Sequence, residues 1–187
     1  MRNILAIVRK ELYSYFFSPM MWIVFSVFLL LLGWMFVSLT GKFAMEYAHY
    51  LQQREIHRGI REVVFNTNSR VLVPLLGNTS VVLLLIIPTL TMRLFAEEYD
   101  NGTMELLLTR PVTVTQLVLG KYLAALVVLS LMLASTALYP ALLAIYGSID
   151  LGPVYTAYGV TFLVGASFMA FGVFASACTT SQLVAVV

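Results

Sequence analysis

Long apolar runs without charge alternate with shorter polar stretches along the whole chain. Four of these runs are long enough to cross about 30 Å of hydrocarbon as a helix. We expect them to form membrane spans at residues 20–40, 71–92, 122–146 and 154–177. The hydropathy pattern therefore predicts an all-α fold, a polytopic bundle of transmembrane helices.

A further apolar run begins at Gln182 and continues to the last residue. Residues 182–187 therefore predict the start of a fifth span, and the polar residues 179–181 are well suited to cap it. A helix that stopped there would leave carbonyl groups without hydrogen-bond partners inside the membrane. We therefore expect the sequence to be part of a longer protein.

Residues 1–17 predict an amphipathic helix that lies in the membrane interface. Arg2, Arg9 and Lys10 fall on one face, where they can point toward lipid headgroups. The opposite face carries apolar side chains at helical spacing: Ile4, Leu5, Val8, Leu12, Tyr15 and Phe16. A signal peptide is the alternative for a basic and apolar N-terminus. Against it, the next apolar run is too long for a signal core, and no small-x-small cleavage site closes that run.

The two connections on the other side of the predicted membrane differ in length. Residues 41–70 form a polar connection between the first two spans, and residues 147–153 form a short turn between the last two. Arg54, Arg58 and Arg61 share one helical face, which indicates a second interfacial helix within the longer connection.

The composition is that of a membrane protein. The chain is 60% hydrophobic and 11% charged, whereas a soluble domain of this size carries about a quarter charged residues. The net charge of +2 is too small to indicate nucleic acid as a partner. The single cysteine, Cys178, excludes an intramolecular disulfide. His49 and His57 do not share a helical face, so we expect no metal site.

The sequence also bears on the source of energy for any transport. No Gly-x-x-x-x-Gly-Lys-Ser/Thr phosphate loop occurs in it. No ionisable side chain lies in the middle of an apolar run, although ion-coupled transporters usually hold carboxylates or histidines within the membrane. We therefore expect no catalytic, cofactor-binding or metal-binding residues in this chain, and energy that comes from a partner.

Residues 93–121 form a charged segment between the second and third spans. Gly102, which follows an asparagine, is typical of the end of a helix. Thr103 is placed to cap a short helix that carries Glu105 in its first turn. Pro111 then ends this short helix.

Thr113 and Gln116 have the spacing of a capping box and predict that the next long helix opens here. The segment therefore predicts a short helix suspended between two membrane helices, where a partner protein could push on it. A solvated loop, whose caps imply no partner, is the alternative that these residues leave open.

Three stretches, residues 92–98, 102–111 and 119–121, resemble permease subunits of ABC transporters of the ABC-2 type. The resemblance extends from the basic N-terminal helix to residues 176–182, and it is greatest to the subgroup associated with bacterial gliding motility. It implies a single ABC-2 type transmembrane domain over residues 1–187, with six spans in the full-length protein.

In that family this segment is the cytoplasmic coupling loop, which docks on the ATP-binding subunit. The resemblance implies that ATP and Mg are bound by that partner subunit and that this chain is not itself an enzyme. It assigns coupling to the ATPase partner to five residues: Glu97, Glu98, Gly102, Glu105 and Pro111.

The resemblance thus implies a membrane-spanning permease subunit of an ATP-driven exporter, which pairs with a second permease copy or a paralogue. Membrane lipid and an auxiliary periplasmic or membrane subunit are further expected partners, and nucleic acid is not. Two alternative classes are an ion-coupled carrier or channel, and a membrane scaffold that transports nothing.

The positive-inside rule does not decide the orientation. Six lysines and arginines lie on the side of residues 1–17 and 93–121, and five lie in residues 41–70. The resemblance implies the bacterial inner membrane and a cytoplasmic N-terminus, because it places the central segment on the ATP side. The connections at 41–70 and 147–153 are then expected outside.

Overall fold

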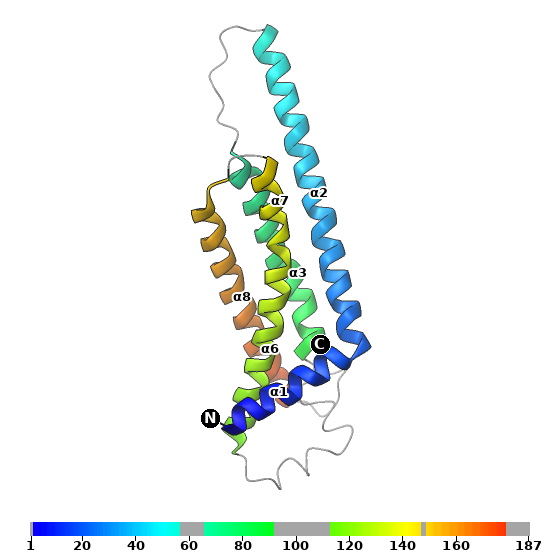
Figure 1. Ribbon diagram of the computed structural model, residues 1–187, viewed down its shortest axis with the longest axis vertical. Helices are drawn as coiled ribbons and strands as arrows, with labels where there is room; N and C mark the ends of the chain where they lie inside the picture. The colour runs from blue at the N-terminus through cyan, green and yellow to red at the C-terminus, as the bar shows by residue number, and fades with distance from the viewer. Residues whose placement is uncertain (1, 57–65, 92–112, 147–148, 179–187) are drawn as a thin grey trace.

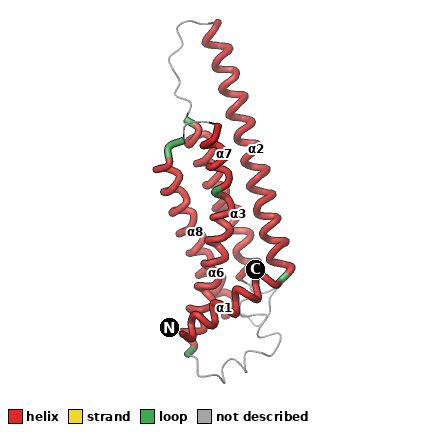
Figure 2. The backbone as a smooth tube through the Cα atoms, viewed as in Figure 1, coloured by secondary structure: helices red, strands yellow, loops and turns green. Residues whose placement is uncertain are grey.

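The computed structural model describes residues 2–56, 66–91, 113–146 and 149–178. Within these ranges the regular structure is entirely helical (Figure 2). Four helices are long and apolar enough to cross a membrane. The prediction of an all-α polytopic bundle is therefore confirmed.

The four helical segments of membrane length run roughly side by side, and α1 lies across one end of them (Figure 1). We call that end the α1 end and the other the opposite end. The elements in chain order are α1 (Arg2–Phe17), α2 (Pro19–Ile56), the π-helix η1 (Asn68–Leu72), α3 (Val73–Thr91), α6 (Val114–Thr136), α7 (Leu138–Tyr146) and α8 (Leu151–Cys178).

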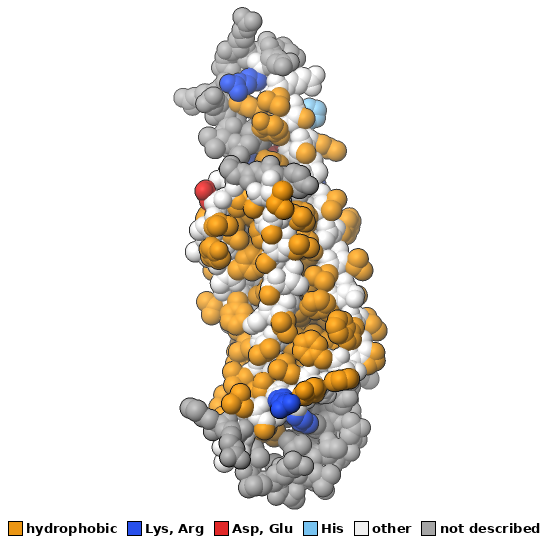
Figure 3. Space-filling view, in the orientation of Figure 1, with side chains coloured by type: hydrophobic (Ala, Val, Ile, Leu, Met, Phe, Trp, Pro, Cys, Tyr) orange, Lys and Arg blue, Asp and Glu red, His pale blue; other side chains and the backbone are white. Residues whose placement is uncertain are grey.

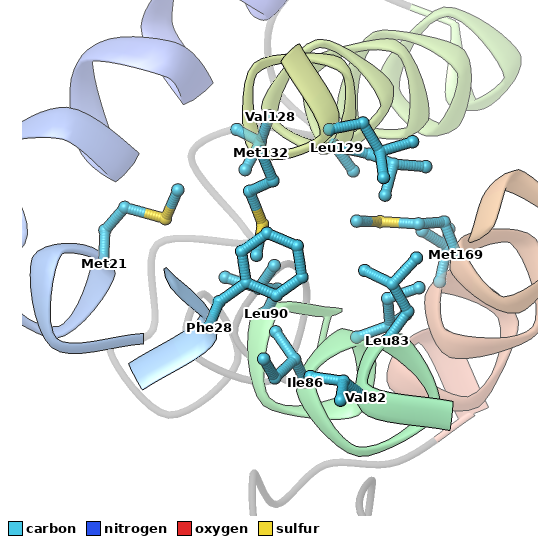
Figure 4. Packing of buried hydrophobic residues seen from close by; sticks show 14 of the residues in the cluster. Met21, Phe28, Val82, Leu83, Ile86, Leu90, Val128, Leu129, Met132 and Met169 are labelled. Atoms are coloured by element: carbon cyan, nitrogen blue, oxygen red, sulfur yellow. The ribbon is translucent and has the colours of Figure 1, made fainter. Parts of the chain in front are cut away.

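On the face shown in Figure 3, charged side chains lie near the two ends, and apolar side chains cover the length between them. The interior of this apolar belt is formed where α2, α3, α6 and α8 meet. Figure 4 shows part of this core, which includes Phe28, Leu83, Val128, Leu129, Met132 and Met169. An apolar exterior around an apolar core is what a bundle surrounded by lipid requires, since lipid tails are as apolar as the core itself.

Helix α2 is longer than the sequence predicts. We expected a span at residues 20–40 followed by a connection at 41–70, but the helix continues without a break to Ile56. Residues 42–56 contain no proline or glycine and are rich in good helix formers, so nothing ends the helix where its apolar run ends. Its 38 residues reach about 57 Å, so α2 overhangs the opposite end of the bundle (Figure 1).

The third span begins earlier than residue 122 and is divided into two helices. The capping prediction is confirmed, because α6 opens at Val114 with Thr113 as its N-cap. The Thr113 side chain accepts a hydrogen bond from the Gln116 backbone N–H at 3.4 Å. At the other end, Pro140 lacks the N–H that would bond to the Thr136 carbonyl, and α6 ends at that residue before α7 begins.

Candidate functional site

Residues 92–112 lie between α3 and α6 along the chain, and α1 packs on α6 and reaches the end of α3 through one hydrogen bond (Figure 1). We call this contact the α1 junction. It comprises Ile7, Glu11 and Tyr15 of α1, Leu90 of α3, and Gly120 and Lys121 of α6. The junction is the candidate functional site, because residues 92–112 are joined along the chain to these two helix ends.

A buried ion pair joins α1 to α6. Lys121 Nζ donates a hydrogen bond to Glu11 Oε1 at 3.3 Å. Lys121 is 1% exposed and Glu11 is 7% exposed. Lys10 Nζ also lies 3.3 Å from the same carboxylate oxygen, but its own side chain is largely exposed. One carboxylate therefore links the surface cation of α1 to the buried cation of α6.

This burial makes the two charges dependent on each other. A charge removed from water costs several kcal/mol, which a buried partner offsets only with good geometry. Removing one partner of such a pair typically destabilises a protein by about 3–5 kcal/mol, because the other charge stays buried without compensation. The pair therefore joins α1 to α6 at one defined point, with Glu11 against Lys121.

The close approach of α1 to α6 depends on a missing side chain. A Cβ atom added to Gly120 would lie 2.7 Å from Ile7 Cγ2 and 2.9 Å from Ile7 Cβ. Such distances are too short for carbon atoms that are not bonded, so any larger residue would push the two helices apart. Gly120 and Lys121 are adjacent, and together they provide a close contact and an ion pair on one turn of α6.

The contact with α3 is made through a hydrogen bond. The Tyr15 hydroxyl donates to the Leu90 carbonyl at 3.2 Å. Leu90 lies one residue before Thr91, the last described residue of α3. Tyr15 therefore joins α1 to this end of α3.

Helix α8 holds the same two helix ends from another side. A Cβ atom added to Gly172 would collide with Thr91 Oγ1 and lie 2.8 Å from Thr91 Cβ. On α6, the Tyr122 hydroxyl donates to the Ala166 carbonyl of α8 at 3.2 Å. Each flank of residues 92–112 is therefore fastened to both α1 and α8.

The face of α1 that packs on the bundle differs from the apolar face that the sequence predicts for a helix in the membrane interface. Leu5 is 69% exposed and Phe16 is 40% exposed, so these two members of the apolar face do not pack on the bundle. The packed face is rotated and carries Glu11 at its centre: Ile4, Ile7, Val8, Glu11, Leu12 and Tyr15 are buried or partly buried. The rotation is explained by the ion pair, since the buried Lys121 requires Glu11 to face the bundle.

The predicted interfacial cations lie on α1, away from its packed face. Arg9 and Lys10 are exposed, and the Arg9 guanidinium carbon lies 5.6 Å from the centre of the Tyr13 ring. A hydrogen bond with the Tyr13 side chain raises the pKa of Arg9, so this group stays charged. Arg2 opens the helix, and its side chain lies outside the described part.

The residues predicted to couple the chain to an ATPase fall outside the described ranges. They are Glu97, Glu98, Gly102, Glu105 and Pro111. Their role therefore stays a prediction. What the structure adds is the way in which both flanks of their segment are anchored.

Sequence reasoning missed Glu11 and misjudged Lys121, which it counted as a charge of the connecting segment. A signal for Glu11 was present, because this lone acid sits between Ile7 and Tyr15 at spacings of four residues. For Lys121 the signal was weaker. Its partner is 110 residues away in the sequence, and no local pattern reveals that contact.

A second set of polar contacts lies at the opposite end. Tyr139 of α7 stacks on Phe36 of α2 with ring centres 5.0 Å apart, and its hydroxyl donates to the Leu29 carbonyl at 3.2 Å. The hydroxyls of Thr136 and Tyr158 lie 3.0 Å apart. Among the described residues, no group of three or more His, Cys, Asp or Glu side chains is placed to hold a metal.

These features define a polytopic helical membrane protein in which an N-terminal helix clasps the flanks of one interhelical segment. The family model described as ABC-2 family transporter protein matches residues 5–187, so the chain belongs to that family. The predicted resemblance to ABC-2 type permeases is thus confirmed, and an ATP-binding partner is implied in general. No curated protein and no solved structure matches the chain.

Proposed function

We propose that this chain is the membrane-spanning half of an ATP-driven exporter. It pairs with a second permease and works with ATP-binding subunits that hold ATP and Mg. Membership of the ABC-2 family and the four membrane-length helices support this assignment. The N-terminus and residues 92–112 lie on the cytoplasmic side of a bacterial inner membrane, where ATP is available.

The observation that carries the proposal is the double anchoring of residues 92–112. Leu90 and Thr91 on one flank, and Gly120 to Tyr122 on the other, each contact both α1 and α8. A push on the segment by an ATP-binding subunit reaches α1 and α8 together with α3 and α6. Four helix ends then move as one body, which is what tilting the spans requires.

Within the segment, Glu97, Glu98 and Glu105 are proposed to pair with basic side chains of the ATP-binding subunit. Such pairs fix the orientation and identity of a partner more than they add affinity. Gly102 supplies a tight turn that other residues adopt only at a cost of about 1–2 kcal/mol. Pro111 ends the short helix before α6 begins. The support for these roles is the family membership and the position of the segment between anchored helix ends.

Two finer assignments rest on the sequence resemblance. One is the export direction, and the other is the subgroup associated with gliding motility. Away from the α1 end, the spans offer Ser, Thr and Asn as polar groups, together with tyrosine hydroxyls at the opposite end. This weak polarity suits an amphipathic cargo such as a lipid-like molecule or a peptide.

The test is a charge reversal within the segment. Glu105→Lys should insert and fold normally, but it should weaken co-purification with an ATP-binding subunit encoded beside this chain, or lower the ATPase activity of the purified complex. The matched control is Glu46→Lys, an exposed charge reversal at the opposite end. Normal assembly and ATPase activity in both Glu105→Lys and the Glu97→Ala/Glu98→Ala double variant would remove the support for coupling through this segment.

A further inference from the structure

Helix α2 packs on the bundle with one side only. Phe28 and Leu32 are fully buried on that side, whereas Leu30 and Trp34 are each 72% exposed on the other. Only 17% of the most apolar stretch of α2 is buried, compared with 50% of the corresponding stretch of the span that contains α3. The outward side of α2 is therefore left uncovered by the described residues (Figure 1).

The outward side follows a heptad pattern. Its members are spaced alternately three and four residues apart over 25 residues, about 37 Å of helix. All are exposed except Gly41, which is partly buried. We call this set the α2 stripe: Val27, Leu30, Trp34, Val37, Gly41, Ala44, Ala48 and Leu51. An apolar repeat of this spacing is the pattern by which two helices pack side by side.

The stripe continues beyond the part of α2 that lipid can cover. The apolar run ends near residue 40, and Glu46 pairs with Arg70 at 3.4 Å, which places residue 46 level with the start of α3. Ala48 and Leu51 lie past this point, in the overhang of α2 (Figure 1). Within the membrane an exposed apolar stripe needs no protein partner, but outside it such a stripe marks an interaction surface.

Charge is arranged to permit self-association along the stripe. Lys42, Glu46 and His49 occupy the other sides of the overhanging helix, and Glu46 is already paired within the chain. From residue 27 to residue 51 the charged residues are Lys42 and Glu46, and neither lies in the stripe or at the heptad positions that flank it on the helix surface. Two copies could therefore meet without placing like charges opposite each other.

We propose that α2 pairs along this stripe with α2 of a second copy of this chain. In a dimer whose two-fold axis is normal to the membrane, the helices run parallel and each stripe residue faces its own counterpart. Gly41, Ala44 and Ala48 are small enough for the two backbones to approach closely. The inference rests on the proposed function in one respect, the presence of two permease copies, and it assigns the surface that joins them.

Disulfide cross-linking in cell membranes tests the pairing with the complete complex present. Single cysteines are placed in a Cys178→Ser background by Ala44→Cys, Ala48→Cys and, as the matched off-stripe control, His49→Cys. A disulfide needs Cα atoms about 4.4–6.8 Å apart, so the two stripe positions should form cross-linked dimers and His49→Cys should not. Equal cross-linking at Ala48 and His49, or a cross-link to a different protein, would overturn the proposal.

A second pair of variants keeps the proposal testable if the oxidation step is inefficient. Ala48→Glu places like charges opposite each other, so the affinity of the two copies should fall at least about tenfold. His49→Glu should leave it unchanged. A dimer that is unaffected by Ala48→Glu would show that α2 is not the interface. If the ATP-binding subunit still co-purifies, only this inference fails, whereas its absence would count against the proposed function.

Discussion

At the α1 end of the bundle, a carboxylate and an ammonium group are buried against each other, with Glu11 on α1 and Lys121 on α6. At the opposite end, the ion pair of Glu46 and Arg70 has both side chains about half exposed. In the buried pair, each charge is stabilised by the other. In the exposed pair, water can hydrate both charges if the two side chains separate. The difference indicates that the α1 end keeps its geometry under load, while contacts at the opposite end can rearrange at low cost.

The packing of the helices also differs between the two ends of the bundle. Around residues 92–112, close approaches at Gly120 and Gly172 lock α1 on α6 and α8 on α3. At the opposite end, α6 gives way to α7 at Ala137, and a Cβ atom added to Gly77 of α3 would meet nothing within 4 Å. A transporter that is driven from one side needs a stiff end that receives force and a second end that opens.

The largest effect is expected from breaking the buried ion pair. Glu11→Ala removes the ion pair between Glu11 and the buried Lys121, so the free energy of unfolding in detergent should fall by about 3–5 kcal/mol. The double variant Glu11→Leu/Lys121→Met removes both charges and should recover most of that loss. A Glu11→Ala protein as stable as the unaltered one would mean that the pair does not hold α1 in place.

A smaller loss in the free energy of unfolding is expected when Gly120 is replaced by a larger residue. In Gly120→Ala the new methyl group meets Ile7, and overpacking of this kind costs about 1–3 kcal/mol. Adding Ile7→Ala should restore part of the free energy of unfolding that Gly120→Ala loses. Gly77→Ala is the control, because that position is open and alanine is the better helix former. Equal effects at the two glycines in thermal unfolding would contradict the close contact of α1 with α6.

Tyr15→Phe should cost less again, since it removes one hydrogen bond to the Leu90 carbonyl and keeps the ring. A typical intramolecular hydrogen bond contributes about 0.5–1.5 kcal/mol. Hydrogen exchange at the end of α3 should increase in this variant, because the end of that helix is held less firmly. Unchanged exchange there would mean that Tyr15 does not fix α1 to α3.

The smallest effect is expected at the opposite end. Glu46→Gln breaks an exposed ion pair, and such pairs contribute at most about 1 kcal/mol. The free energy of unfolding should therefore change little. A loss as large as that of Glu11→Ala would show that the two ends of the bundle do not differ in this way.

The overall architecture was accessible from the sequence because the length of an uncharged run is a strong constraint in lipid. The start of α6 was accessible too, because a threonine cap is a local feature. The extent of α2 was missed, since we treated the end of an apolar run as the end of a helix. The helix continues because residues 42–56 favour helix whether or not lipid surrounds them.

The α1 junction could not be predicted in the same way. Its face on α1 is set by the contact of Glu11 with Lys121, and the two are far apart in the sequence. Amphipathic periodicity predicted one apolar face that includes Leu5 and Phe16, and it could not separate the residues that pack on the bundle from those that stay exposed, because an apolar residue that faces lipid looks the same as one that faces protein. The role of Gly120 likewise appears only when Ile7 is seen against it.

We propose that α1 and the flanks of residues 92–112 move as one body, and a reversible cross-link across the junction tests this. Cysteines replace Glu11 and Lys121, whose charged groups lie 3.3 Å apart, in a Cys178→Ser background. The two thiols are joined by a short reducible cross-linker, and the ATPase activity of the complete complex is measured with the link intact and again after it is reduced. We predict that the activity is the same in both states. Activity that is lost with the link intact and restored on reduction would show that α1 slides over α6 during the cycle, which contradicts the proposal.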